Sequence, residues 1–364
     1  VLALDCSGTI PLRAPNCSSL QMLAVVAAAA LLSQFGAQGL KLFTEDGPSL
    51  PGDRDAPEPP PSEFIDLLSK SSQPIQPMSW ADANLLASQV VADLSMDELL
   101  NLAHGSHFSF QKMAPETGFY TGNTEAVPRL GIPALKMQDA GQGFRPTDPA
   151  QNGTTTSFPC LLALASTWDE TLTGLVASSI AEEFASKGAN VMLGPSVNVH
   201  RVATNGRNFE YLSGEDPYLG SRLTFKFVEA VQAAGVMATV KHFAFNEQET
   251  NRQVQNSVVD ERTAWELYYP PFEAAVGAGV GAIMCSYNRV NGSFACESEE
   301  LLKHVLRDRM KFKGLVMSDW YATHAHSALL RGLDQEMPGT DGSQVGNVIS
   351  HINLAKIQKL KDPV

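Results

Sequence analysis

The sequence is short of positive charge and has no long hydrophobic run. Its 26 Lys and Arg residues stand against 39 Asp and Glu residues, so the formal net charge is −13. A nucleic-acid-binding protein gathers Lys and Arg on one face, and this balance therefore argues against a nucleic-acid partner. The apolar run at 23–32 is much shorter than the ~20 residues that a transmembrane helix needs, so we expect no stable membrane insertion.

Several common catalytic motifs are also missing. The sequence has no H-E-x-x-H, no G-x-x-x-x-G-K-S/T, no G-x-G-x-x-G and no G-x-S-x-G pattern. These motifs belong to zinc hydrolases, P-loop proteins, dinucleotide-binding folds and serine hydrolases respectively. Their absence removes those four interpretations.

The cysteines lack the spacing of metal or redox sites. Five are present, Cys6, Cys17, Cys160, Cys285 and Cys296, and no two are separated as in C-x-x-C. A structural zinc site or a thioredoxin-like motif is therefore not expected, and we predict no metal and no cofactor. Cys285 and Cys296 are close enough in sequence to close one loop as a disulfide in an exported protein, and two buried free thiols are the alternative.

The first 79 residues are predicted to be an export signal followed by a linker. Residues 1–39 form an upstream segment in which about 22–39 fit a signal peptide, because an apolar core is followed by the small residues Ala37 and Gly39. A buried Ala-rich helix is the alternative for that core. Prolines crowd the stretch 40–79, which favours extended conformations and cannot bury a core.

Two further features of the sequence concern secretion and processing. Sequons at Asn16, Asn152 and Asn291 are compatible with a secreted, extracellular glycoprotein. Position 1 is Val rather than Met, which indicates a fragment or a processed product.

From Trp80 onward, signals for helices and strands alternate. The capping-box pattern S/T-x-x-E occurs at Ser95 and at Thr167 and predicts that a helix begins near each of them. Short apolar runs bounded by glycine lie between the helices, as in parallel strands covered on both faces. These runs are 132–137, 191–193, 236–240, 280–285 and 314–317. The alternation predicts a βα barrel or a doubly wound sheet.

Polar side chains follow these apolar runs. They include Asp139, Asn198, His200, Lys241, His242, Ser286, Tyr287, Asn288, Asp319 and Trp320, and Glu336 follows the further stretch 332–334. In a parallel barrel all strands open on one face, whereas a doubly wound sheet gathers only the residues at its switch point, so this number favours the barrel. Carboxylates and cations in one pocket suit a polyhydroxylated ligand, because sugar hydroxyls both donate and accept. An aromatic face such as that of Trp320 can cover the C–H side of a pyranose.

Several sequence blocks resemble one enzyme family. The blocks are 136–139 with 143–145, 194–201, 206–210, 214–217, 241–243, 246–252, 284–288 with 291–292, 318–320, and 332–339. In this order, over roughly residues 80–345, they resemble glycoside hydrolase family 3 in its β-glucosidase branch. The stretch 241–252 lacks the Pro-Gly-His-Gly run of the family's N-acetylglucosaminidases, which speaks against a hexosaminidase.

The resemblance implies an α/β fold in which residues 80–364 form a TIM-like (β/α)8 barrel, with one strand sometimes short or reversed. In the family, a second α/β sandwich domain supplies the general acid/base Glu. The sequence ends at Val364 before such a domain, so we expect that domain to be missing and assign the acid/base to no residue of this chain.

The implied activity is that of a retaining β-glucosidase, which hydrolyses terminal β-glucosyl residues of β-glucosides or cello-oligosaccharides through a covalent glycosyl-aspartate, as in cellulose degradation. The alternatives are a β-xylosidase of the same family and a truncated, non-catalytic sugar-binding protein. The sequence makes no prediction about the oligomeric state.

Site residues follow from the matching blocks. Asp319 in Ser-Asp-Trp is similar to the family's catalytic nucleophile. The residues expected around the glycosyl unit are Asp139, Arg145, Arg207, Lys241 and His242 as binders, Met284 and Tyr287 as lining, and Trp320 as platform. We expect the neighbouring cations to keep the pKa of Asp319 low. Glu210 is expected to be an ion-pair partner of Arg207, and Glu247 and Glu249 are expected to be loop scaffolding.

Overall fold

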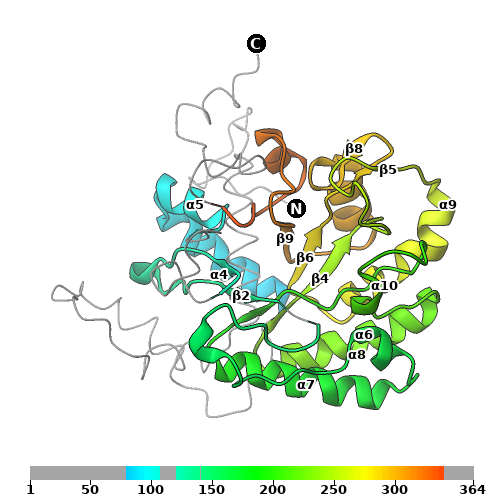
Figure 1. Ribbon diagram of the computed structural model, residues 1–364. Coiled ribbons are helices and arrows are strands. Elements are labelled where there is room, and N and C mark those ends of the chain that lie inside the picture. Colours follow the sequence, from blue (N-terminus) through cyan, green and yellow to red (C-terminus); the bar gives the residue numbers. More distant parts are fainter. Residues whose placement is uncertain (1–78, 107–119, 140, 340–364) are drawn as a thin grey trace.

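The computed structural model describes residues 79–106, 120–139 and 141–339 (Figure 1). The predicted signal segment at about 22–39, almost all of the linker 40–79, and residues 340–364 lie outside the described residues. Within the described ranges, no helix is long and apolar enough to cross a membrane.

The helices alternate with strands as the sequence predicts. They are α4 (Trp80–Asp93), α5 (Met96–Leu102), α6 (Leu161–Ala165), α7 (Glu170–Ser186), α8 (Pro217–Ala233), α9 (Glu261–Thr263) and α10 (Pro270–Gly277), with the π-helical segments η5 (Ala264–Tyr268) and η7 (Glu300–Arg309). Ser95 forms the predicted capping box with Glu98. The prediction at Thr167 is wrong by two residues, because the Asp169 carboxylate accepts from the first free N–H groups of α7.

Six strands form one sheet. They are β1 (Gly122–Asn123), β2 (Lys136–Gln138), β3 (Val191–Met192), β4 (Met237–Phe243), β6 (Ala282–Cys285) and β9 (Leu315–Ser318), in the order β1-β2-β3-β4-β6-β9. The last five pair in parallel, and β1 runs antiparallel to β2. Each of the five predicted apolar runs therefore contains strand residues, although β2 takes in only the last two residues of the run 132–137. A second small sheet joins β5 (Asn256–Ser257), β7 (Arg289–Val290) and β8 (Ser293–Phe294).

Two short segments link β9 back to β1. On one side, Ser318 N donates to Gln335 O at 2.8 Å, and Glu336 N donates to Ala103 O at 3.0 Å. On the other side, Ser106 N donates to Asn123 O at 2.8 Å. The segments 103–106 and 334–336 thus complete a hydrogen-bonded ring of eight members. This is the predicted TIM-like barrel, in which one member is reversed, 334–336 joins its two neighbours by isolated bridges, and 103–106 joins β1 by the Ser106–Asn123 hydrogen bond.

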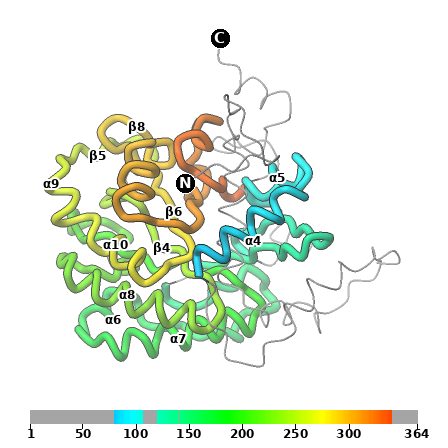
Figure 2. Tube along the Cα trace, turned by 180° about the vertical axis from the view of Figure 1, so that it is seen from behind, coloured from blue at the N-terminus to red at the C-terminus, as the bar shows by residue number. Residues whose placement is uncertain are grey.

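Amphipathic helices cover the outside of the strands. Figures 1 and 2 show α7, α8 and α10 side by side along one flank, with α4 and α5 on another. In α8, the side chains of Leu223, Phe227 and Val231 recur at four-residue spacing, and all are fully buried. That stripe packs on the sheet and leaves the polar face of the helix to solvent.

A close approach of two main chains at the ring closure allows no side chain at Gly105. A Cβ placed there would lie 2.1 Å from the carbonyl oxygen of Pro338. We expect Gly105→Ala to lower the free energy of unfolding by about 3 kcal/mol, because the backbone must move apart. Gly174→Ala in α7 is the matched control, since a Cβ there meets nothing within 4 Å. Urea denaturation measures both variants, and equal stabilities would contradict this closure.

Candidate active site

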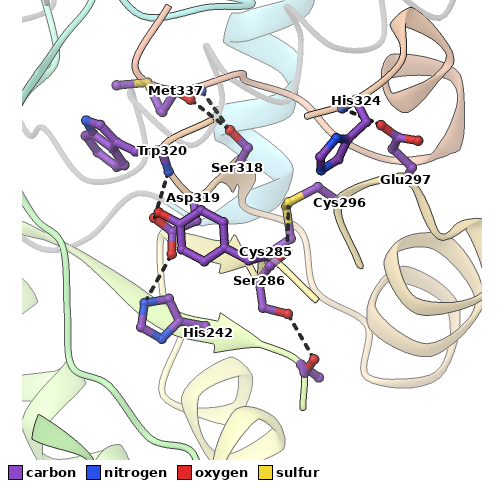
Figure 3. Close-up of a disulfide and its surroundings, with 12 residues drawn as sticks. His242, Cys285, Ser286, Cys296, Glu297, Ser318, Asp319, Trp320, His324 and Met337 are labelled. Carbon is purple, nitrogen blue, oxygen red and sulfur yellow. Dashed lines mark hydrogen bonds and ion pairs between the residues drawn. A yellow bond between two sulfur atoms is a disulfide. The ribbon is translucent and has the colours of Figure 1, made fainter. Parts of the chain in front are cut away.

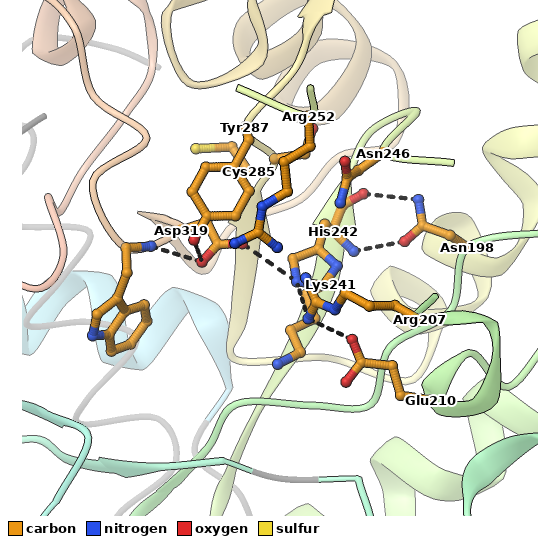
Figure 4. Close-up of polar contacts among 12 residues, drawn as sticks. Asn198, Arg207, Glu210, Lys241, His242, Asn246, Arg252, Cys285, Tyr287 and Asp319 are labelled. Atoms are coloured by element: carbon orange, nitrogen blue, oxygen red, sulfur yellow. Dashed lines mark hydrogen bonds and ion pairs between the residues drawn. The ribbon is translucent and has the colours of Figure 1, made fainter. Parts of the chain in front are cut away.

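Several of the predicted polar residues, among them Lys241, Tyr287 and Asp319, converge at the carboxyl ends of the strands (Figure 4), whereas the side chains of Ser286 and Asn288 donate to the main chain at Ala244. Asp139 follows β2, His242 lies near the end of β4, Tyr287 follows β6, and Asp319 follows β9. In a barrel with parallel strands these ends open on one face. The strands therefore position the side chains that the sequence singled out.

The two oxygens of the Asp319 carboxylate have different surroundings. Oδ1 accepts hydrogen bonds from Tyr287 Oη at 2.8 Å and from the main-chain N–H of Trp320 at 2.7 Å. Oδ2 lies 3.4 Å from His242 Nε2 and has no hydrogen-bond partner among the described residues. One oxygen is thus anchored, and the other keeps free lone pairs, which suits attack on an electrophile.

The imidazole of His242 is buried and neutral. Its Nε2 lies 3.2 Å from Arg207 Nη2, and its Nδ1 lies 3.2 Å from Tyr211 Oη. A guanidinium only donates, so we assign the lone pair to Nε2 and the proton to Nδ1. Burial, together with the charges of Arg207, Lys241 and Arg252, holds the pKa of His242 well below its usual value. The contact between His242 and Asp319 is therefore not an ion pair.

Asp139 lies between two cations. Its Oδ2 lies 2.7 Å from Arg145 Nη2, and its Oδ1 lies 3.5 Å from Lys241 Nζ. Although burial raises the pKa of Asp139, the charges of Lys241, Arg145 and Arg207 outweigh it, and the pKa is lowered on balance. Asp139 is accordingly a carboxylate that can accept from sugar hydroxyls.

The expected low pKa of Asp319 is wrong. Burial raises the pKa of this carboxyl above its ordinary value and outweighs Arg207 and Lys241, as well as the hydrogen bonds from Tyr287 and Trp320. The sequence reveals the neighbouring cations but not how deeply the carboxyl is buried, and burial decides whether the pKa of Asp319 rises or falls.

Arg207 is the central cation of the site. It forms an ion pair with Glu210, as expected, and its Nη1 lies 3.9 Å from a carboxylate oxygen of Glu249. Glu249 also pairs with Arg252 at 2.7 Å. Glu249 thus connects two arginines of the site, which is a more specific role than the loop scaffolding that we expected.

The indole of Trp320 is fixed by β1. Its Nε1 donates to the carbonyl oxygen of Thr121 at 3.2 Å. A Cβ at Gly122 would lie 3.0 Å from the indole ring, so the strand approaches Trp320 as closely as a glycine allows. A side chain at position 122 would therefore press on the indole and on Met337, whose Cε would lie 2.8 Å from the added Cβ.

Cys285 and Cys296 form a disulfide in the structure (Figure 3). It ties the end of β6 to the turn η6 (Ala295–Glu297) and closes the loop that carries Tyr287. The carbonyl oxygen of Cys285 accepts from Asp319 N at 3.1 Å. The disulfide is thus adjacent to the main chain of Asp319.

Other residues of the site were not predicted from the sequence. Tyr211 follows no apolar run, although it contacts His242. Arg252 lies in a matching block but had no predicted role, and its guanidinium lies 4.1 Å from the centre of the Tyr287 ring. Met284 is buried in the hydrophobic core, and its expected place along the sugar site stays a prediction. Among the described residues, no group of three or more His, Cys, Asp or Glu side chains could hold a metal ion.

The chain belongs to a known hydrolase family. Residues 78–337 match the Glycosyl hydrolase family 3 N terminal domain. The barrel and the converging side chains are those that the sequence blocks led us to expect for this family.

The similar proteins are β-glucosidases. The chain is 38% identical over 276 residues to a β-glucosidase of Rhizobium radiobacter, covering 75% of this chain and 32% of that protein. It is 38% identical over 305 residues to the probable β-glucosidase A of Aspergillus terreus, covering 78% and 34%. The chain thus spans about a third of the length of these relatives.

Solved structures give the same result. The β-glucosidase 3B of Thermotoga neapolitana, in complex with glycerol, superposes with a TM-score of 0.68 at 36% identity, over 76% of this chain and 39% of that one. A β-glucosidase of Streptomyces venezuelae in complex with D-glucose gives a TM-score of 0.68 at 36% identity, over 76% and 35%.

Proposed function

We propose that this chain carries the glycosyl-binding barrel of a retaining β-glucosidase, with Asp319 as the nucleophile. The observation that carries this proposal is the asymmetry of Asp319, whose Oδ1 is anchored by Tyr287 and Trp320 while Oδ2 is free. Sugar hydroxyls can find an acceptor in Asp139 and donors in Lys241 and Arg145, which lie on the same face of the barrel. β-Glucosides and cello-oligosaccharides are the proposed substrates.

In the proposed reaction, Oδ2 of Asp319 attacks the anomeric carbon, and the bond to the leaving oxygen breaks. A retaining enzyme needs a second carboxyl about 5–5.5 Å away to protonate that oxygen and later to activate water. We assign this proton donor to none of the described residues. A leaving group that needs no proton therefore tests Asp319 alone.

The test uses 2,4-dinitrophenyl 2-deoxy-2-fluoro-β-D-glucoside on the folded chain. Oδ2 displaces dinitrophenolate, and the fluorine slows the loss of the glycosyl ester, so the label accumulates on Asp319 and is located by peptide mass. The corresponding xyloside tests the β-xylosidase alternative, for which it should react faster than the glucoside. Glucose binding without any label would favour the non-catalytic sugar-binding alternative.

The rate of this labelling should fall with decreasing pH. Asp319 attacks only when ionised, and its pKa is raised by burial, so the midpoint should lie above that of an ordinary Asp. Tyr287 lowers this pKa by donating to Oδ1, and Tyr287→Phe should move the midpoint to higher pH. Labelling rates between pH 4 and pH 8 measure both midpoints, and an unchanged profile in the variant would contradict the role of Tyr287.

We further propose that the protein is secreted and glycosylated. The Cys285–Cys296 disulfide supports this, because disulfides persist in oxidising compartments. The sequon residue Asn152 is exposed and follows a turn. Expression through a eukaryotic secretory route with endoglycosidase digestion tests the modification, and a product without glycan at Asn152 would contradict it.

A further inference from the structure

β4 has one extra residue at the point where Lys241 and His242 lie. Val240 pairs with Ile283 and Phe243 pairs with Cys285, so three steps along β4 match two steps along β6. Such a bulge disrupts the regular hydrogen-bond ladder. Buried main-chain groups still need partners, and His242 is 1% exposed.

The carboxamide of Asn198 binds both main-chain groups of His242. Asn198 Oδ1 accepts from His242 N at 2.7 Å, and Asn198 Nδ2 donates to His242 O at 3.1 Å. A side chain here supplies the donor and the acceptor that a neighbouring strand would supply elsewhere. Figure 4 shows Asn198 beside His242, on the side away from Asp319.

Glu247 holds the remaining N–H of this carboxamide. Asn198 Nδ2 also donates to Glu247 Oε1 at 3.0 Å. Glu247 is 8% exposed, and burial raises its pKa to about 8. The carboxyl is therefore mostly protonated at neutral pH, and glutamine, which is neutral and keeps the Oε1 acceptor, imitates it closely.

We propose that Asn198 and Glu247 are positioning residues that fix the main chain of His242, so that its imidazole lies between Arg207 and the free oxygen of Asp319. The ring contacts both at short range, with Nε2 3.2 Å from Arg207 Nη2 and 3.4 Å from Asp319 Oδ2. A small movement of the strand therefore displaces the imidazole from both. This inference rests on the proposed function, in which Asp319 is the nucleophile.

The first experiment compares Glu247→Leu with Glu247→Gln in the labelling reaction. Leu leaves a buried N–H of Asn198 without an acceptor, so we expect the labelling rate to fall about tenfold. Gln keeps the acceptor, and its rate should stay within about twofold of the wild type. Equal rates for all three proteins would overturn the proposal.

A double-mutant cycle separates positioning from general destabilisation. If Glu247 acts through His242, Glu247→Leu should add little to the effect of His242→Ala, because the ring that it positions is gone. If the two effects on the labelling rate multiply independently, Glu247 does not act through His242, and the proposal fails.

A measurement that does not depend on activity tests the positioning of His242 separately from the proposed function. The ring ¹⁵N shifts of His242, identified with His242→Ala, report its tautomer and contacts. We expect Glu247→Leu to shift them and Glu247→Gln to leave them in place. If the wild type is never labelled, the proposed function fails while these shifts still decide the positioning. Unmoved shifts in Glu247→Leu would overturn it.

Discussion

Replacing Asp319 by Asn should abolish covalent labelling. The amide keeps the shape of the carboxylate and an oxygen that can accept from Tyr287 and Trp320, so the barrel should stay folded. It has no anionic oxygen in the position of Oδ2, and we expect the labelling rate to fall at least about a thousandfold, as for other lost nucleophiles. Intact-mass spectrometry of the protein after incubation with the dinitrophenyl fluoroglucoside measures the loss.

Asp308→Asn is the matched control for this variant. The Asp308 side chain is 68% exposed on η7, where it pairs with His304, so the Asp308→Asn protein should label like the wild type. Circular dichroism of both variants shows whether they are folded. A folded Asp319→Asn protein that still takes up one glycosyl group would refute the assignment of the nucleophile.

Replacing Arg207 by Met should cause the largest loss of stability among the residues of the site. The guanidinium faces Glu210 and Glu249, and its side chain is 23% exposed. Without it these carboxylates lose their shared cation in a mostly buried place, and the free energy of unfolding should fall by about 3 kcal/mol. The pKa of His242 should rise, because Arg207 helps to keep it low.

Arg222→Met provides the comparison. Arg222 also pairs with a carboxylate, that of Glu170, but its side chain is 55% exposed. Exposed pairs of this kind contribute roughly 0–1 kcal/mol. Urea denaturation measures the stabilities, and NMR titration of the imidazole measures the pKa. If both arginine variants were equally stable, the ion pairs of Arg207 would be no stronger than those of a surface residue.

The strands and most of the site could be predicted from the sequence. The apolar runs contain strands because most of their side chains are buried on both faces, and several of the residues after them face one opening. The ring closure could not be predicted, since 103–106 and 334–336 are too short for a hydrophobic period and pair across a long stretch of chain. The sequence also could not decide whether Thr167 or Asp169 caps α7, since both residue types can cap a helix and local geometry selects one.

Other parts of the site depend on burial and distance, which the sequence does not give. Glu247 lies only five residues after His242, and nothing in the pattern says that it reaches Asn198 rather than solvent. The sign of the Asp319 pKa shift depends on a competition between burial and charge. Tyr211 enters the site through a tertiary contact, because its hydroxyl lies against the imidazole of His242.

The pairing of Glu336 with Ala103 has a consequence for biosynthesis. The segment 103–106 is synthesised more than two hundred residues before its partner, the segment 334–336. Until then the growing chain exposes two unpaired edges, to which other nascent chains can add. Because contacts so distant in sequence form slowly, closure is expected to come after translation has passed residue 336, and chaperones that shield strand edges should matter most in that interval.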